Sequence, residues 1–317
     1  MKKLLSVFLA GIITLTISAC GTAGGTRLIL GTGGNAGVYD SFGQALSYVL
    51  SEHSGFQITP QSTGGSKDNI SGIHSGDLQL GLVQSDVMTY AWQGRRSFQQ
   101  EGRMDCFRTV AGLYPESVQL ITTDPSVEEA EDLRGMTVSV GSQGSGVYFS
   151  AFDVLDAANI TFNDIMPVYQ DFEESARSLE SGEIDAAFIV AGTPTPAVTE
   201  LFRNHEVYLV PISQLTRKRL LDACPFYVET TIPGNTYAGQ SEDVETVGVT
   251  AALVASADVS ESEIYELLEV LFQKKDDLRS LHGIGNMLDL RAAASITTAP
   301  YHDGAVRYYR DQGIDVK

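Results

Sequence analysis

The sequence predicts an α/β fold with two halves of similar design. Short apolar segments typical of strands alternate with segments whose apolar residues recur at helical spacing. Several of these strands run into turns rich in glycine, serine and threonine, and a helix begins after each turn. The same pattern restarts after Asp124. With 317 residues, of which 43% are hydrophobic, the chain can bury the core of one large domain or of two medium-sized ones.

The chain is strongly acidic, with a formal net charge of −19. A surface of this sign repels phosphate backbones, so we expect no nucleic-acid partner. An anionic ligand would have to be held by local hydrogen-bond donors, because the field of the whole molecule opposes its approach.

Residues 1–19 are typical of an export signal, and 20–26 of a flexible tether. Lys2 and Lys3 precede an apolar run that is too short for a membrane span. The residues leading up to Cys20 resemble a bacterial lipobox, which implies cleavage before Cys20 and a lipid on its sulfur. The alternative is an ordinary secretory signal cut nearby. Both interpretations predict a periplasmic protein whose membrane contacts beyond an anchor are made through a partner.

The predicted compartment affects the interpretation of the two remaining cysteines. An oxidising space permits a disulfide between Cys106 and Cys224, and two buried free thiols are the alternative. Neither cysteine lies in a C-x-x-C motif or beside a histidine, so the sequence does not indicate redox or nucleophilic chemistry.

The first predicted strand, 27–30, runs into a glycine-rich turn and then into a helix. Gly31, Gly33 and Ala36 satisfy the relaxed dinucleotide fingerprint G-x-G-x-x-A. However, Glu52, the acid at the spacing needed to bind a ribose, precedes the second strand instead of ending it. We therefore expect no nucleotide cofactor.

The second unit contains the turn that we expect to organise the site. A strand at 56–59 leads into a turn at 61–66, and the next helix carries Ile70. Gly64 and Gly65 let a ligand approach the backbone closely. The bare N–H groups and the positive end of the helix dipole then form an anion site. The alternative is an ordinary capped turn, since helix starts commonly have this composition.

The third predicted strand, 80–83, delivers Gln84, Ser85 and Asp86 at its carboxyl end. In open α/β sheets, ligands bind beyond the carboxyl ends of the strands. For Ser85 and Asp86, simple capping of the following helix is the alternative.

Two crossings between the halves are predicted. Strands at 109–114 and 118–122 come first, and the second of them leaves the first half. A long strand at 247–254 fits the return, and Ser260 with Glu263 then predicts a capping box. Crossings near residues 121 and 246 would form a hinge between lobe 1, residues 27–121 and 246–317, and lobe 2, residues 122–245.

The second half repeats the strand, turn and helix pattern. A strand at 137–140 runs into a turn at 141–148, and a strand at 184–190 ends at a threonine- and proline-rich turn, 191–196. Ser145 lacks the flanking glycines of the G-x-S-x-G nucleophile elbow, which argues against a serine hydrolase.

Taken together, the glycine-, serine- and threonine-rich helix starts indicate a binding site. If they converge on a cleft, they would hold a small carboxylate with neutral donors. The sequence shows no paired acid and base, so we expect no enzyme. We also expect no metal, because metal-ligand spacing is missing among the five histidines, His53, His74, His205, His282 and His302.

These motifs resemble those of the TAXI (TRAP-associated extracytoplasmic immunogenic) solute receptors. The resemblance runs in consistent order from about residue 27 to 313 and includes Ser62-Thr63-Gly64-Gly65-Ser66, Gln84-Ser85-Asp86 and the segment from Pro300 to Ala305. It implies a type II periplasmic binding protein, with two α/β lobes closing on a cleft. It also implies delivery of glutamate, 2-oxoglutarate or a related small carboxylate to a sodium-coupled TRAP permease. Asp303 and Met136 depart from the family's usual residues.

The resemblance also implies a set of ligand contacts. We expect the Gly64-Gly65-Ser66 turn with Asn69 to take one carboxylate, and the turn at 144–146 to take another polar end. Tyr39 would wall the cleft or serve as a packing aromatic, and Asp86 would cap a helix or pair with a ligand ammonium group. The implied contacts are Thr32, Gly33, Val38, Tyr39, Ser62, Thr63, Gly65, Ser66, Asn69, Gln84, Ser85, Gly144, Ser145, Thr193 and Thr195.

The expected mechanism is an open–closed equilibrium in which the ligand favours closure and the permease recognises the closed form. Two alternatives stay open. The same lobes could serve a membrane sensor kinase, and an exported hydrolase would require a nucleophile and base that the sequence does not show.

Overall fold

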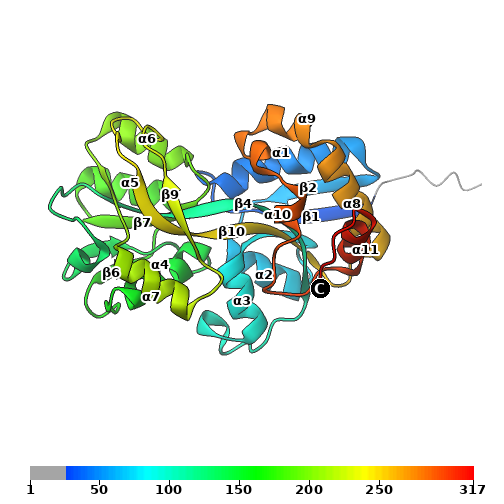
Figure 1. Cartoon of the computed structure of the whole chain (residues 1–317), viewed down its shortest axis with the longest axis horizontal. Coiled ribbons are helices and arrows are strands. Elements are labelled where there is room, and N and C mark those ends of the chain that lie inside the picture. Colours follow the sequence, from blue (N-terminus) through cyan, green and yellow to red (C-terminus); the bar gives the residue numbers. More distant parts are fainter. Residues whose placement is uncertain (1–25) are drawn as a thin grey trace, which may run out of the picture.

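The computed structural model describes residues 26–317. The predicted export signal, most of the predicted tether and Cys20 lie outside this range. In the described part of the chain, no helix is both long and apolar enough to cross a membrane. The described part is elongated, with two groups of helices joined by long strands (Figure 1).

Eight of the strands belong to one half of the molecule or the other. They are β1 (Thr26–Gly31), β2 (Phe56–Gln61), β3 (Leu80–Gln84), β5 (Thr137–Ser139), β6 (Met166–Val168), β7 (Ala186–Ala191), β8 (Tyr208–Val210) and β9 (Val228–Ile232). β1 pairs in parallel with β2 and β3, and β5 pairs in parallel with β6 and β7. Parallel pairing brings carboxyl ends to one edge of a sheet, so each half presents a row of strand-to-helix junctions.

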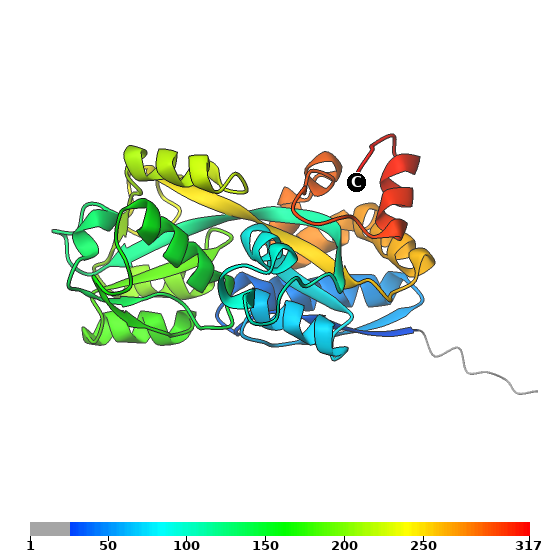
Figure 2. The same cartoon turned by 90° about the horizontal axis from the view of Figure 1, so that it is seen from below.

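Two long antiparallel strands, β4 (Phe107–Thr122) and β10 (Val244–Ser256), connect the halves. The sheet order is β2-β1-β3-β10-β4-β7-β5-β6, with β8 on β4 and β9 on β10. β10 pairs with β3 through one end and with β9 through the other. The two long strands run side by side across the molecule in both views (Figures 1 and 2).

The prediction of separate strands at 109–114 and 118–122 is wrong, because both belong to β4. Pro115 and Glu116 keep the chain extended and are paired in register with Thr250 and Val249 of β10. Pairing with the neighbouring strand therefore keeps β4 continuous through these two residues.

The helices begin close to where the sequence predicts them. Phe42, Leu46, Val49 and Leu50 all face the core from α1, as their helical spacing indicates. The bounds are α1 (Val38–His53), α2 (Ser66–Ser75), α3 (Ser85–Gln93), α4 (Gly146–Ala157), α5 (Phe172–Ser181), α6 (Pro196–Asn204), α7 (Gln214–Ala223), α8 (Glu261–Gln273), α9 (Lys275–Leu281), α10 (Leu290–Ala293) and α11 (Asp303–Asp311), with 3-10 turns η1 (Arg96–Phe98), η2 (Ala130–Leu133) and η3 (Gly283–Met287).

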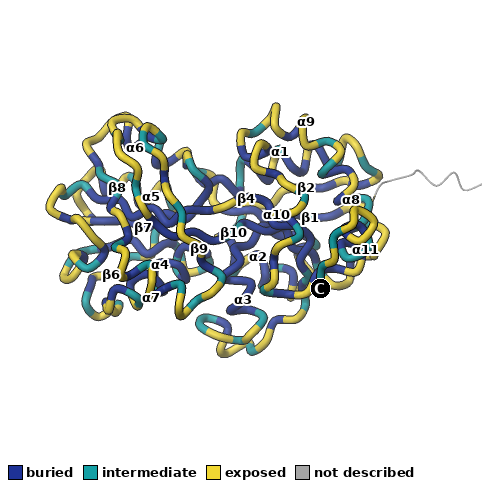
Figure 3. The backbone as a smooth tube through the Cα atoms, in the orientation of Figure 1, coloured by how far each residue is buried: buried dark blue, intermediate teal, exposed yellow. Residues whose placement is uncertain are grey.

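Strand β7 shows why the buried strands are continuously apolar. Ala187 and Ile189 pack into one hydrophobic cluster, whereas Ala186, Phe188 and Val190 pack into the other on the opposite face. The buried backbone accordingly follows the central strands, and exposed segments lie on the outer helices and loops (Figure 3).

The disulfide that the two cysteines permit is not formed. Cys106 and Cys224 are both free and half-buried. Cys106 directly precedes β4, and its carbonyl accepts a hydrogen bond from Ala257. Cys224 follows α7, and its sulfur lies 3.7 Å from the Tyr90 hydroxyl. The fold therefore places the two thiols in different settings, each as a free and half-buried residue.

Candidate functional site

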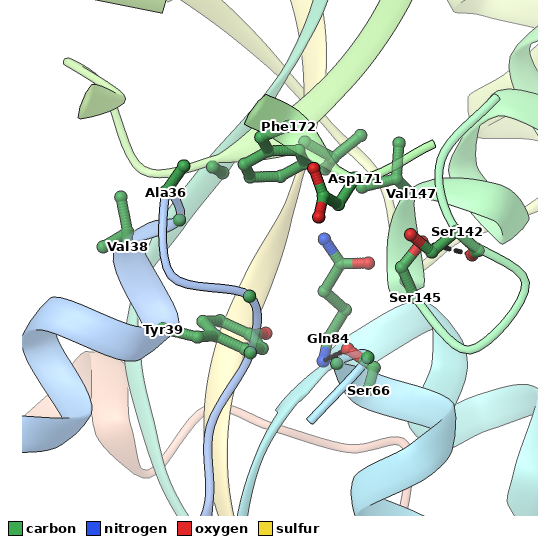
Figure 4. A pocket seen from close by; sticks show the side chains of 18 of the residues that line it. Ala36, Val38, Tyr39, Ser66, Gln84, Ser142, Ser145, Val147, Asp171 and Phe172 are labelled. Atoms are coloured by element: carbon green, nitrogen blue, oxygen red, sulfur yellow. Dashed lines mark hydrogen bonds between the residues drawn. The ribbon is translucent and has the colours of Figure 1, made fainter. Parts of the chain in front are cut away.

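A cavity of about 120 Å³ lies where the strand-to-helix junctions of the two halves meet. The Gln84 side chain extends into it between Tyr39 on one side and Ser145 on the other (Figure 4). The lining residues are Gly33, Gly34, Asn35, Ala36, Gly37, Val38, Tyr39, Gly64, Gly65, Ser66, Gln84, Glu116, Ser142, Ser145, Gly146, Val147, Gln170, Asp171, Phe172, Glu173, Val190 and Ala191.

Five helices direct their N-termini at this cavity. Their N-cap residues, Gly37 of α1, Gly65 of α2, Gln84 of α3, Ser145 of α4 and Asp171 of α5, all line it. The first three provide no side-chain cap. Each helix N-terminus carries a partial positive charge and unpaired N–H groups, so their convergence favours a bound anion.

The two halves touch at the edge of the cavity. The backbone N–H groups of Lys67 and Asp68 both donate to the carbonyl of Gly144, at 3.1 and 3.3 Å. Gly65 adopts φ +114°, a conformation that other residues rarely reach, and a Cβ there would lie 3.4 Å from the Cα of Ser145. These contacts describe a closed arrangement in which the turns predicted to bind a ligand enclose the cavity.

Gly146, the first residue of α4, allows another close approach. A Cβ at this position would lie 1.7 Å from Oε1 of Gln84. A side chain here would therefore push Gln84 out of its place in the cavity wall.

The buried wall of the cavity contains a carboxyl group, Glu116 of β4, which is 2% exposed. The Tyr39 hydroxyl donates to its Oε2 at 3.1 Å. Burial raises the pKa of Glu116 to about 8, against a smaller lowering by hydrogen bonds from Gln84 and Tyr39. Burial, with the nearby Glu116 carboxyl, also raises the pKa of Tyr39 well above its usual value.

Among the lining residues there is no lysine, arginine or histidine, although Glu116, Asp171 and Glu173 all supply carboxyl groups. Asp171 and Glu173 are exposed at the rim. The positive potential in the cavity therefore comes from backbone groups alone.

Seven of the fifteen implied ligand contacts line the cavity. They come from β-to-α junctions in both halves and surround a common space. They are Gly33, Val38, Tyr39, Gly65, Ser66, Gln84 and Ser145.

The other eight do not line it, and most of their polar groups serve the framework. Thr63 donates to Asn69, while Asn69 donates to the carbonyls of Gly31, Thr32 and Leu82. Asn69 is fully buried behind the turn, so its polar groups hold the wall in place. The eight residues outside the lining are Thr32, Ser62, Thr63, Asn69, Ser85, Gly144, Thr193 and Thr195.

Ser85 and Thr195, two of these eight, use their polar groups in hydrogen bonds within the protein. The Ser85 hydroxyl accepts a hydrogen bond from the Thr250 N–H of β10 at 3.1 Å. The Thr195 hydroxyl donates to the carbonyl of Gly192 and accepts from Gln119. The backbone N–H of Thr195 donates to Tyr237. The turn predicted at 191–196 is thus built into the second half of the sheet. Of its residues only Ala191 lines the cavity, next to Val190 of β7.

Asp86 is neither an N-cap nor part of the cavity lining. It is the second residue of α3 and is fully buried, where the hydroxyls of Ser150 and Tyr227 donate to its carboxylate. Burial, with the neighbouring Asp153 carboxyl, raises the pKa of Asp86 to about 7.

Sequence reasoning missed several lining residues, and Glu116, Asp171 and Phe172 show which signals were available. Glu116 is a single acid between two strongly apolar segments, and that isolation was a usable signal. Asp171 and Phe172 begin α5 after the short strand β6, where a capping box of Asp171 and Glu174 marks the helix start. Over residues 26–317, no group of three or more potential ligands could hold a metal ion.

Comparison with known proteins identifies a sequence family and several similar folds. A sequence model described as the NMT1-like family matches residues 30–313. The structure resembles MatC from Rhodopseudomonas palustris with bound malate, at 14% identity and a TM-score of 0.57, covering 82% of this chain and 88% of that one.

Two further similar structures are sulfonate-binding proteins. The periplasmic aliphatic sulphonate binding protein SsuA from Escherichia coli shares 15% identity and a TM-score of 0.50, covering 90% of this chain and 83% of that one. The alkanesulfonate-binding protein SsuA from Xanthomonas axonopodis pv. citri bound to MOPS is 13% identical, with a TM-score of 0.51. The match covers 90% of this chain and 91% of that one. At these identities the likeness concerns the fold, and it confirms the predicted two-lobed α/β class.

Proposed function

Because the chain belongs to the NMT1-like family, we propose that it is an extracytoplasmic receptor that captures a small carboxylate and delivers it to a membrane transporter. The observation that carries this proposal is the convergence of five helix N-termini on one cavity whose lining has no basic side chain. Backbone N–H groups and helix dipoles bind anions without a counter-ion from the protein.

The ligand in this proposal is L-glutamate or a related dicarboxylate such as 2-oxoglutarate. The cavity volume of about 120 Å³ is the space open to the centre of a water-sized sphere. One water needs about 10–15 Å³ of this space, so the cavity holds on the order of ten water-sized groups. That is close to the number of non-hydrogen atoms in a five-carbon dicarboxylate. The ligand contacts proposed are the seven implied residues that line the cavity.

Capture and release would use the two long strands as a hinge. We assign residues 27–121 and 246–317 to lobe 1 and 122–245 to lobe 2, with β4 and β10 crossing between them. The contacts of the Lys67 and Asp68 N–H groups with Gly144 join these lobes in the closed form. A ligand that touches both sides would favour this form, because it gains contacts there that the open form lacks.

The transporter in this proposal is a sodium-coupled TRAP permease, which the receptor's closed form would recognise. Support comes from the resemblance of the sequence motifs to TAXI receptors. Export by residues 1–19 and lipidation of Cys20 complete the proposal, and Cys20→Ser should release the receptor from the membrane fraction if the lipid anchors it. Uptake of the identified ligand in cells lacking the receptor gene would connect binding to transport.

Ligand binding is the decisive test. Thermal-shift screening of the purified mature protein with glutamate, glutamine, 2-oxoglutarate and C4 dicarboxylates should reveal at least one that raises the melting temperature, and calorimetry should then give one site per chain. Turnover of an ester or amide substrate, with no binding of any acid, would contradict the proposal and favour a hydrolase.

A further inference from the structure

Two acceptor groups in the cavity wall have no cationic partner. Glu116 is the buried carboxyl of the cavity, and one of its oxygens accepts from Tyr39. Gln84 is also buried, and its Oε1 has no hydrogen-bond partner among residues 26–317. A buried acceptor without a donor loses the hydrogen bond it would make to water, so such a group indicates a missing donor.

Within residues 26–317, no cationic side chain faces Glu116. The groups that face it are Tyr39 from α1, Gln84 from the end of β3, and Tyr114 on β4 itself, and the nearest other ionisable group that affects it is Asp86 of α3. None of these is a cation. An ionised carboxylate buried without a partner is strongly disfavoured, so Glu116 is protonated in the ligand-free cavity near neutral pH, consistent with its raised pKa.

We propose that Glu116 forms a subsite for a ligand ammonium group, so that the receptor selects an amino acid over the corresponding acid without an amino group. This inference rests on the proposed function, because it concerns the ligand of the same cavity. The carboxylate of the ligand would lie at the N-termini of α1, α2 and α4, and its ammonium at Glu116. The cavity would then match both charges of a zwitterion.

Binding at this subsite requires a proton to leave. The Glu116 O–H bond breaks and its proton passes to the buffer, while the ligand ammonium keeps all its protons and pairs with the carboxylate. Below about pH 8 the complex therefore contains one proton fewer than the free receptor and free ligand together. Affinity for the ligand then rises with pH until Glu116 is ionised in the free receptor. If instead a neutral Glu116 donated a hydrogen bond to a ligand carboxylate, the pH dependence of affinity would have the opposite sign. Affinity would then fall above about pH 8.

The experiment compares an amino acid with its deaminated analogue, beginning with L-glutamate and glutarate. If another amino acid binds best in the ligand screen, it and its own analogue replace this pair. Calorimetry at pH 7 in buffers of different ionisation enthalpy gives the number of protons released. We expect glutamate to bind about 10- to 100-fold more tightly than glutarate, the range for a charge-assisted hydrogen bond, with release of about one proton.

Glu116→Gln tests the residue directly. It keeps the shape of the side chain but removes the charge, so it should weaken glutamate binding about 10- to 100-fold and abolish proton release, and it should weaken glutarate binding less than glutamate binding. Glu200→Gln, an exposed position outside the cavity, is the matched control and should change neither quantity. If Glu116→Gln does not fold, Tyr39→Phe offers a second test, because loss of its hydrogen bond should shift proton release to higher pH.

The outcomes separate this inference from the proposed function. Equal affinity for glutamate and glutarate, or an unchanged affinity and proton release in Glu116→Gln, would overturn the ammonium subsite and leave the receptor in place. Failure of every acid to bind the unaltered protein would overturn the receptor itself.

Discussion

At the scale of single residues, the cavity depends on close contacts that particular side chains permit. Gly146 lies against Gln84, and Asn69 supports the turn from behind. Gly146 therefore leaves room for the Gln84 side chain in the wall, whereas Asn69 holds the backbone of the turn. Substitutions at the two positions should differ accordingly in their effects.

Gly146→Ala should weaken ligand binding by at least about tenfold. The new Cβ would meet Oε1 of Gln84 at 1.7 Å, so Gln84 must leave its position in the wall. Calorimetry measures the loss, and circular dichroism checks the fold. Gly283→Ala is the control, since its Cβ meets nothing within 4 Å. Equal binding by the Gly146 variant and the unaltered protein would show that Gln84 does not shape the site.

Asn69→Ala should act mainly on stability. Its Nδ2 lies within 2.8–3.1 Å of three backbone carbonyls, and its Oδ1 accepts from Thr63. Removal leaves several buried groups unsatisfied and should lower the free energy of unfolding by about 2–3 kcal/mol. Urea unfolding measures this change against Asn204→Ala, an exposed control. A variant of unchanged stability that fails to bind would instead make Asn69 a direct ligand contact.

At the scale of elements, some capped helix starts only support the fold, whereas others also line the cavity. Sequence patterns do not distinguish the two. The capping boxes at Ser260 of α8 and at Asp171 of α5 have the same hydrogen-bond pattern. Asp171 additionally lines the cavity, whereas Ser260 does not. Similar local chemistry therefore supports the fold at one helix and shapes the site at another.

Ser260→Ala and Asp171→Ala test this division. Each removes a cap and should lower the free energy of unfolding by about 1 kcal/mol. Only Asp171→Ala should also change ligand affinity, because α5 is one of the five helices directed at the cavity. Denaturant unfolding and calorimetry on both variants provide the comparison. A similar change of affinity in Ser260→Ala would mean that general destabilisation, not the position of the cap, alters binding.

At the scale of the whole molecule, a buried acidic cluster joins α3 to α4. The Tyr227 hydroxyl lies 3.3 Å from a carboxylate oxygen of Asp86 and 3.2 Å from one of Asp153. Arg96 pairs with Asp153, and both carboxyls are buried. Burial raises the pKa of Asp153, although Tyr90 and Arg96 oppose the shift. A single arginine balances two acids, so ionisation of Asp86 works against the contact between the halves.

This cluster predicts a stability that falls as pH rises from about 4 to 7. Between the pKa of Asp86 in the unfolded chain, about 3.9, and its folded value of about 7, only the folded state holds the proton. The free energy of unfolding therefore loses up to about 1.4 kcal/mol per pH unit from this group. Asp86→Asn should make the slope shallower in urea unfolding between pH 4 and 8. Asp222→Asn, exposed at the surface, should retain the original slope, and the same slope in Asp86→Asn would place the proton elsewhere.

Sequence by itself determined the strand, turn and helix units at the start of each half, the glycine-rich junctions and the capping box at Ser260, because these depend on residues within a few positions of one another. It also indicated a site at the helix starts, and seven of the implied contacts line the cavity. Local patterns could not show which polar side chains at the junctions face the cavity and which form hydrogen bonds with the surrounding backbone, as Asn69 does.

Only the tertiary structure decided the chemistry of the cavity wall. Tyr39 and Glu116 are 77 positions apart, and their hydrogen bond exists because α1 and the crossing strand β4 pack together. The same packing unites 109–114 with 118–122 in one strand and keeps the two cysteines as separate thiols. Burial, which no local pattern records, is what raises the pKa of an acid in an apolar strand where that strand lines the cavity.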